Sequence, residues 1–132
     1  MEVRGVFSGM NISETGLRAE KKRMEAIANN LANVNTTRTE EGGPYKKQEV
    51  ILKAKEGLNG VDVAGLYQDD NFRLVYDPQH PDANKEGYVK YPDVDLPKEW
   101  AKMVTASRAY EANIAAFNLQ KQSMMKSLDL LK

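Results

Sequence analysis

The sequence predicts a mainly α fold with a small β insert, in which long N- and C-terminal helices form a coiled coil around a β-rich middle region. Two observations lead to this prediction. Apolar residues recur at heptad spacing near both ends of the 132-residue chain, as they do in helices that pack along a seam. Between the ends, short apolar stretches alternate with turn residues, which is typical of strands. We expect three regions, namely residues 1–40, 41–95 and 96–132.

The N-terminal helix is predicted over residues 10–34. One seam column contains Met10, Leu17, Met24 and Leu31. In the second column, the polar residues Ser13 and Glu20 interrupt the early heptads, and Ile27 and Val34 fill the later ones. A helix of about 24 residues is roughly 36 Å long at a rise of 1.5 Å per residue. The run NTTRTEEGGP contains turn and cap residues and ends the helix.

Four asparagines crowd the end of this helix. They are Asn29, Asn30, Asn33 and Asn35. Asparagine tolerates the left-handed backbone at which helices often stop. We interpret the four side chains as one polar edge of a helix that ends in a defined way.

The middle region contains four candidate strands between Tyr45 and Asp95. They lie in YKKQEVILK, GVDVAGLY, FRLVYD and GYVKY, and turn-rich segments join them. An insert of about fifty residues with three or four short strands has only a thin core of its own. We therefore expect it to lean on the helices or on a neighbouring molecule.

The C-terminal helix is predicted to begin near DVDLPKEW, with Asp93 or Asp95 as its N-cap and Pro97 in its first turn. It would contain about 36 residues and be roughly 54 Å long. The predicted seam is Trp100, Met103, Ser107, Tyr110, Ile114, Phe117, Lys121, Met124, Leu128 and Leu131. Because the N-terminal helix is expected to be shorter, about a third of this seam would lack a partner within the chain, which indicates assembly with other subunits.

The composition argues against catalysis and against nucleic-acid binding. Nineteen basic residues balance nineteen acidic ones, and there is no cysteine, so no overall field attracts nucleic acid and no thiol chemistry is available. The basic run at residues 18–25 contains glutamates, and we interpret it as a solvated helix face with Arg18 or Lys21 paired to Glu25. Nucleotide-binding fingerprints are missing from the sequence. We predict no enzyme activity, no cofactor and no metal.

His80 is the only histidine, and it lies in YDPQHPDAN between Asp77 and Asp82. A rigid turn is the favoured interpretation of that segment. Two alternatives to a structural assembly protein remain open: a small hydrolase centred on His80, and a soluble helical adaptor that dimerises through the C-terminal helix.

The N-terminal segment does not have the pattern of a cleavable signal peptide, because it lacks a basic stretch followed by an apolar core. The sequence also contains no apolar run of membrane-spanning length. We therefore expect no direct membrane insertion. If the chain is exported, we expect a route without signal cleavage.

The stretch ANNLANVNTTRT resembles the N-terminal signature of bacterial flagellar axial proteins, which include the rod and hook components. Three further segments are similar, in order and spacing, to successive signatures of the FlgC family of flagellar rod proteins. They are TTRTEEGGPYKKQEV, VYDPQHPDANKEGYVKYPDVD and ASRAYEANIAAFN. The resemblance extends from about Ile12 to the end of the chain.

This resemblance implies a structural subunit of the flagellar basal-body proximal rod. Such a subunit is exported by the flagellar type III apparatus and polymerises, with copies of itself and with other rod proteins, into a periplasm-spanning drive shaft around the export channel. The terminal helices would form the inner coiled-coil layer, and the asparagines would make helix-to-helix and helix-to-loop hydrogen bonds. The residues expected at subunit contacts are Leu17, Met24, Ile27, Leu31, Val34, Asn29, Asn30, Asn33, Asn35, Tyr110, Ile114, Phe117, Met124, Leu128 and Leu131.

Overall fold

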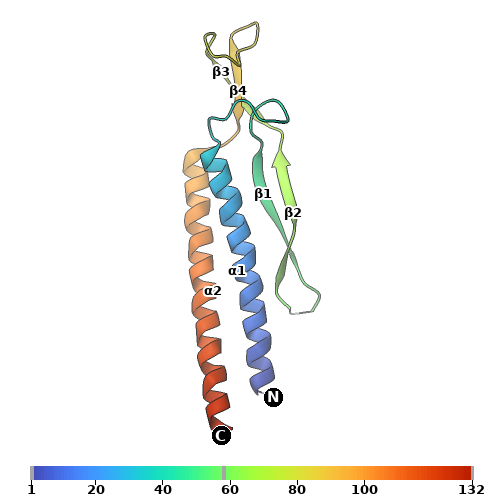
Figure 1. The fold of residues 1–132 in the computed structure, drawn as a ribbon, viewed down its shortest axis with the longest axis vertical. Helices are drawn as coiled ribbons and strands as arrows, with labels where there is room; N and C mark the ends of the chain where they lie inside the picture. The colour runs from blue at the N-terminus through green and yellow to red at the C-terminus, as the bar shows by residue number, and fades with distance from the viewer. Residues whose placement is uncertain (1, 58, 132) are drawn as a thin grey trace.

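The computed structural model describes residues 2–57 and 59–131. Two long helices lie side by side, and two β hairpins are attached to one end of the pair (Figure 1). The elements are α1 (Glu2–Ala32), β1 (Lys47–Ala54), β2 (Val61–Asp69), β3 (Phe72–Tyr76), β4 (Tyr88–Pro92) and α2 (Leu96–Leu130). The prediction of a mainly α fold with a small β insert is confirmed.

Helix α1 begins earlier than the sequence pattern predicts. It contains 31 residues from Glu2 to Ala32, whereas the heptad pattern begins only at residue 10. The first turns include Gly5 and Gly9, which have low helix propensity, but packing against another helix outweighs such a preference. At Gly9 the two helices approach closely, because a Cβ added there would lie 2.8 Å from the side-chain nitrogen of Gln120.

Helix α2 begins where the sequence predicts, and Asp95 is the N-cap. The Asp95 carboxylate accepts a hydrogen bond of 3.3 Å from the backbone N–H of Lys98, and Pro97 lies in the first turn. α2 contains 35 residues against 31 in α1. The predicted length mismatch is therefore wrong, and no third of α2 extends beyond its partner helix.

The seam between the antiparallel helices differs from the predicted one. The Ser13 hydroxyl donates a 3.0 Å hydrogen bond to Gln120 Oε1 at one end, and Asn30 Nδ2 lies 3.2 Å from Glu99 Oε2 at the other. The α2 column that faces α1 contains Glu99, Ala106, Asn113 and Gln120. The apolar column predicted for this position is therefore one residue out of register.

The displaced column is exposed except at Ser107, which is half-buried and contacts Met24 of α1. The other predicted column lies partly in the seam. Trp100, Ile114 and Leu128 are 59%, 36% and 48% exposed. The half-buried residues of the other column are Met103, Tyr110, Phe117 and Met124. The prediction selected apolar side chains, but this interface uses small and polar ones that let the two backbones approach.

The β region forms two separate hairpins within the described residues. In the β1–β2 hairpin, Lys47 lies opposite Asp69 and Ala54 opposite Val61, with a bulge after Ile51. This hairpin runs alongside α1, whereas the β3–β4 hairpin projects beyond the ends of the helices (Figure 1). The predicted strands are confirmed, and β1 leans on α1 as expected.

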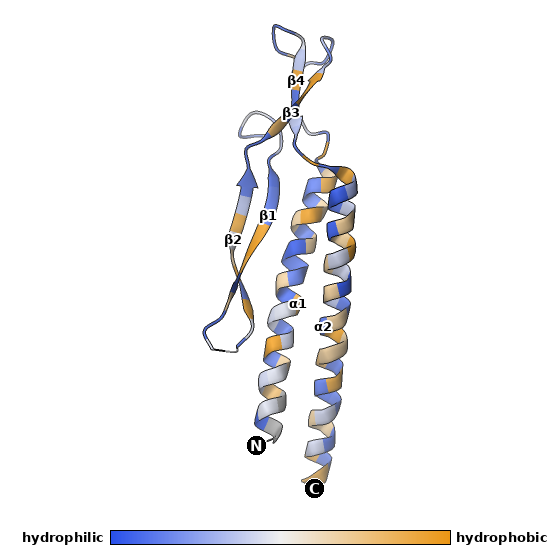
Figure 2. Ribbon diagram, turned by 180° about the vertical axis from the view of Figure 1, so that it is seen from behind, coloured by the Kyte–Doolittle hydropathy of each residue, from blue (hydrophilic) through white to orange (hydrophobic). Residues whose placement is uncertain are grey.

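The hydrophobic core is small. Hydrophobic and hydrophilic residues alternate along both helices (Figure 2). The buried hydrophobic residues are Ala19, Ala26, Ile27, Val89, Val94 and Ala106. In the part of the chain that the structure describes, neither helix is long and apolar enough to cross a membrane.

Candidate assembly interface

A buried polar junction joins α1, α2 and β1, and Asn30 lies at its centre with 1% of its surface exposed. Its Nδ2 donates to the backbone oxygen of Gln48 at 2.9 Å and to Glu99 Oε2 at 3.2 Å. Its Oδ1 accepts from the backbone N–H of Gln48 and from the Tyr45 hydroxyl, both at 2.8 Å. Since an amide side chain offers two donors and two acceptor positions, Asn30 is fully hydrogen-bonded and fixes three elements relative to one another.

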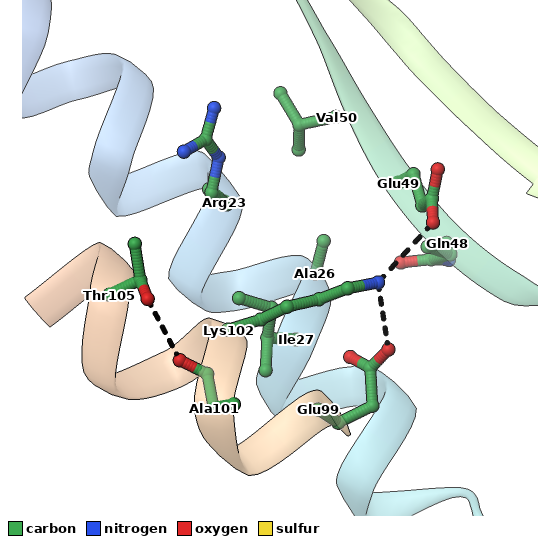
Figure 3. A pocket seen from close by; sticks show the side chains of 10 residues that line it. All are labelled: Arg23, Ala26, Ile27, Gln48, Glu49, Val50, Glu99, Ala101, Lys102 and Thr105. Carbon is green, nitrogen blue, oxygen red and sulfur yellow. Dashed lines mark hydrogen bonds and ion pairs between the residues drawn. The ribbon is translucent and has the colours of Figure 1, made fainter. Parts of the chain in front are cut away.

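The carboxylate of Glu99 lies in the same junction and is 2% exposed. Lys102 Nζ lies 3.2 Å from Glu99 Oε1 and 3.4 Å from Glu49 Oε1 (Figure 3). Burial alone would lower the pKa of Lys102, but the carboxylates of Glu99 and Glu49 raise it above its usual value. The buried negative charge of Glu99 is thereby paired, as buried charges in proteins must be.

A cavity of about 430 Å³ opens beside this junction, between α1, β1 and α2 (Figure 3). Its apolar walls come from Ala26, Ile27, Val50 and Ala101. The side chain of Lys102 extends across it from α2 toward β1 (Figure 3). The cavity therefore combines apolar walls with a charged rim.

The far end of the β1–β2 hairpin is attached to α1 at Thr15, which is 5% exposed. Thr15 Oγ1 donates to the backbone oxygen of Ile12 at 2.7 Å and accepts from the backbone N–H of Val61 at 3.1 Å. Gly60 beside it has a φ of +102°. The hairpin is thus held to α1 at two points, Asn30 and Thr15.

The loops beside the β3–β4 hairpin are joined through Asp82. Its carboxylate accepts hydrogen bonds from the Thr37 hydroxyl at 2.7 Å and from Arg38 Nε at 2.8 Å. These hydrogen bonds, Thr37 first, lower the pKa of Asp82 below its usual range. His80 Nδ1 accepts from the backbone N–H of Asp82 at 3.0 Å, which is the turn geometry expected for this segment. The described residues contain no group of three or more side chains placed to bind a metal ion.

The four asparagines have different environments. Asn30 is buried in the junction. Asn33 instead stabilises the turn after α1: its Nδ2 donates to the backbone oxygen of Asn29 at 2.8 Å, and its Oδ1 accepts from the Thr36 hydroxyl at 3.0 Å. Asn29 and Asn35 are exposed. Hydrogen bonds from the helix end to α2, to β1 and to the following turn therefore occur within the chain. They involve Asn30 and Asn33, and Asn29 Nδ2 also lies 3.4 Å from Gln48 Oε1.

The apolar residues predicted at subunit contacts divide into two groups. Ile27 is buried and Leu17, Met24, Leu31, Val34, Tyr110, Phe117 and Met124 are half-buried, whereas Ile114, Leu128 and Leu131 are exposed. Met24 contacts α2, because the Ser107 hydroxyl lies 3.7 Å from its sulfur. Within the basic run, Lys22 pairs with Glu25 at 3.4 Å, where Arg18 or Lys21 was predicted.

Sequence reasoning missed three members of the junction, Tyr45, Gln48 and Glu99. Two lie in or near β1 and the third in α2, so no local pattern connects them with Asn30. One signal was available. Small and polar residues recur every seven positions from Glu99 to Gln120, and such a column marks a helix face that another helix approaches closely.

We expect the junction to weaken between about pH 10 and 12. Burial, and then the nearby charge of Glu99, raises the pKa of Tyr45 from 10.0 to about 12. Because the folded state holds the phenol proton more tightly than the unfolded chain, this stabilisation is complete below pH 10 and is lost as the pH rises through 12. Urea unfolding followed by circular dichroism at each pH would measure it.

The test compares two tyrosine variants. Tyr45→Phe should lose about 1 kcal/mol at neutral pH with its hydroxyl bond to Asn30, and should show a shallower loss of stability at alkaline pH than the unchanged chain. Tyr67→Phe, at an exposed position of β2, is the matched control. If the free energy of unfolding fell equally with rising pH in all three proteins, the prediction would be contradicted.

Comparison with known proteins gives consistent matches along the chain. Residues 10–38 match the family described as "Flagella basal body rod protein", and residues 85–130 match the one described as "Flagellar basal body rod FlgEFG protein C-terminal". The chain is 39% identical to the flagellar basal-body rod protein FlgC of Borreliella burgdorferi, over 97% of this chain and 99% of the relative. It is 40% identical to FlgC of Bacillus subtilis, over 96% and 98%, and 34% identical to FlgC of Aquifex aeolicus, over 96% and 98%.

Proposed function

Since the chain belongs to the FlgC family of flagellar basal-body rod proteins, we propose that it polymerises through α1 and α2 into the proximal rod. In this role it forms part of the drive shaft and encloses the export channel. As a member of this family it is a structural protein of the basal body and is not an enzyme.

The exposed apolar side chains of α2 are the observation that best supports assembly through the helices. The large ones that share one face of this helix, at 100° per residue, are Leu96, Trp100, Val104, Ile114, Met125 and Leu128. An exposed apolar surface of this kind marks a site of protein contact. In the proposed rod, helices of neighbouring subunits cover these side chains in coiled-coil packing, together with Leu17, Met24, Leu31 and Val34 of the α1 region.

The partners in this proposal are copies of the same chain and other flagellar rod proteins. Contacts between two different surface patches repeat from subunit to subunit, and they produce an open helical assembly when the rotation between subunits does not close a ring. Export through the flagellar type III apparatus, without signal cleavage, and a final position in the rod across the periplasm belong to the same proposal. Family membership supports both.

Deleting the gene in the bacterium that encodes this chain should abolish flagella and motility, because the proposed drive shaft through the basal body would be incomplete. A plasmid copy should restore both, and an epitope-tagged chain should purify with basal bodies. Ile114→Glu together with Leu128→Glu should prevent this recovery, since two charges would enter the proposed subunit contacts, while the purified variant keeps its helical circular dichroism. Arg108→Glu, at an exposed position of α2, is the control.

A finite oligomer that flagella do not need would favour the alternative of a soluble helical adaptor. A tagged chain that remains a dimer or another finite oligomer, in cells whose flagella do not depend on it, would contradict the rod proposal. Membership of a family of structural rod proteins excludes the hydrolase alternative centred on His80.

A further inference from the structure

We propose that the Trp100 side chain of one copy inserts into the cavity between α1, β1 and α2 of a second copy. Subunits would then join side by side through a protruding indole and a matching hole. This inference rests on the proposed rod function and specifies one of its contacts.

Trp100 is the protruding group. It is the only tryptophan in the chain and is 59% exposed near the start of α2. Leu96 and Val104, one helical turn to either side, are 43% and 49% exposed. A tryptophan buries roughly 150–250 Å² when it is fully covered, and tryptophans are enriched among the residues that dominate protein contacts. This patch is therefore suited to a partner that covers it.

The cavity has the size and chemistry that an indole requires. Its volume of about 430 Å³ falls within the roughly 300–1,000 Å³ of small-molecule sites, and Ile27 and Val50 supply apolar walls. Glu49 at the rim offers an acceptor for the indole N–H. The Lys102 ammonium extends across the same space (Figure 3), where a cation is attracted to the face of an aromatic ring.

The geometry requires that the two features belong to different copies. Trp100 and the cavity-lining Thr105 are five residues apart, which places them about 140° apart around α2 but only about 7.5 Å apart along its axis. The indole and the cavity therefore lie at similar heights on opposite flanks of one helix. A contact between such patches repeats around an axis instead of closing a two-fold dimer, and it keeps the long helices side by side.

Disulfide trapping tests this contact without removing the indole. The chain has no cysteine, so Val104→Cys beside the indole and Glu49→Cys at the cavity rim provide a unique pair. Lys102, which contacts Glu49, and Val104 point about 160° apart around α2, so the two cysteines cannot join within one chain. Oxidising basal bodies from a strain restored with this variant should give a ladder of covalent dimers, trimers and longer species.

Two controls show whether the ladder reports the proposed contact. Val104→Cys with Leu119→Cys places the second cysteine on an exposed part of α2 about 22 Å farther along the helix, and should give at least tenfold less ladder. Adding Trp100→Ala to the first pair should also reduce the ladder at least tenfold, and Trp100→Phe should reduce it less. If the alanine variant forms no rods, normal helical circular dichroism of the purified chain and normal rods with Leu119→Ala support the same contact.

Other outcomes overturn the inference. Intact rods that contain the chain but give no ladder from the first cysteine pair would exclude the contact and leave the rod function standing. A ladder that is unaffected by Trp100→Ala, or that is equally strong with the Leu119 pair, would also exclude it. If instead the epitope-tagged chain, expressed in the deletion strain, did not purify with basal bodies, the proposed function itself would be contradicted.

Discussion

Replacing Asn30 with aspartate should lower the free energy of unfolding by about 3–5 kcal/mol, which is the usual effect of leaving an uncompensated charge in a protein interior. The substitution replaces Asn30 Nδ2, which donates to Glu99 Oε2 at 3.2 Å, with a carboxylate oxygen that can only accept. Two carboxylates would then face each other where Asn30 is 1% exposed and Glu99 2% exposed. The backbone oxygen of Gln48 would also lose its donor.

The control for this experiment is the neighbouring residue. Asn29→Asp makes the same chemical change at an exposed position, where the amide donates only a long 3.4 Å hydrogen bond to Gln48 Oε1, and should alter stability by no more than about 1 kcal/mol. Urea unfolding followed by helical circular dichroism would measure both variants. The loss in Asn30→Asp should shrink as the pH is lowered toward about 4, because protonation removes the repulsion. Equal stability of the two variants would show that the junction does not hold the fold together.

Replacing Gly60 with alanine should release the far end of the β1–β2 hairpin from α1. The new Cβ would lie 2.2 Å from Thr15 Oγ1 and 3.3 Å from Thr15 Cβ, so the hydrogen bond between Thr15 and the Val61 N–H could not persist. The φ of +102° adds strain of about 1–3 kcal/mol for any residue with a side chain. We expect a local opening of the hairpin, while the helix pair remains folded.

Amide hydrogen exchange would resolve that opening segment by segment. In Gly60→Ala, residues 52–57 and 59–63 should exchange at least tenfold faster, and the seam residues of α2 should be unchanged. Gly43→Ala is the matched control, because Gly43 also has a positive φ, +75°, but no atom lies within 4 Å of the added Cβ. Similar exchange of the hairpin in both variants would contradict the role of Thr15.

The main elements of this fold could be predicted from the sequence because each has a local signal. Heptad spacing predicted both helices, alternation of apolar stretches with turns predicted the strands, and the Asp95 and Pro97 pair marked the start of α2. The early start of α1 could not be predicted in this way. Its first turns contain Gly5 and Gly9, which have low helix propensity, and Gly9 packs against Gln120 of α2, more than a hundred residues later in the chain.

The candidate site was less accessible, because its geometry depends on contacts distant in sequence. The asparagine cluster drew attention to the correct segment, but only the folded chain separates buried Asn30 from exposed Asn29 and Asn35. The seam of α2 was misplaced for a related reason. Hydrophobicity identified Trp100 and Ile114, whereas the interface with α1 uses the closely approaching face that contains Ala106 and Asn113.

The two attachments of the β1–β2 hairpin have a mechanical consequence. Thr15 and Asn30 are fifteen residues apart, about 22 Å along α1, and the β1–β2 ladder, with its one bulge after Ile51, spans the distance between them. A hairpin attached to α1 at one point could pivot about that point. Because this hairpin is attached at two points, a force that turns the hairpin is passed on to α1. The hairpin therefore acts as a splint: bending that stretch of α1 requires the ladder to shear, and a sideways load on the β region reaches the helix as rotation of the whole unit.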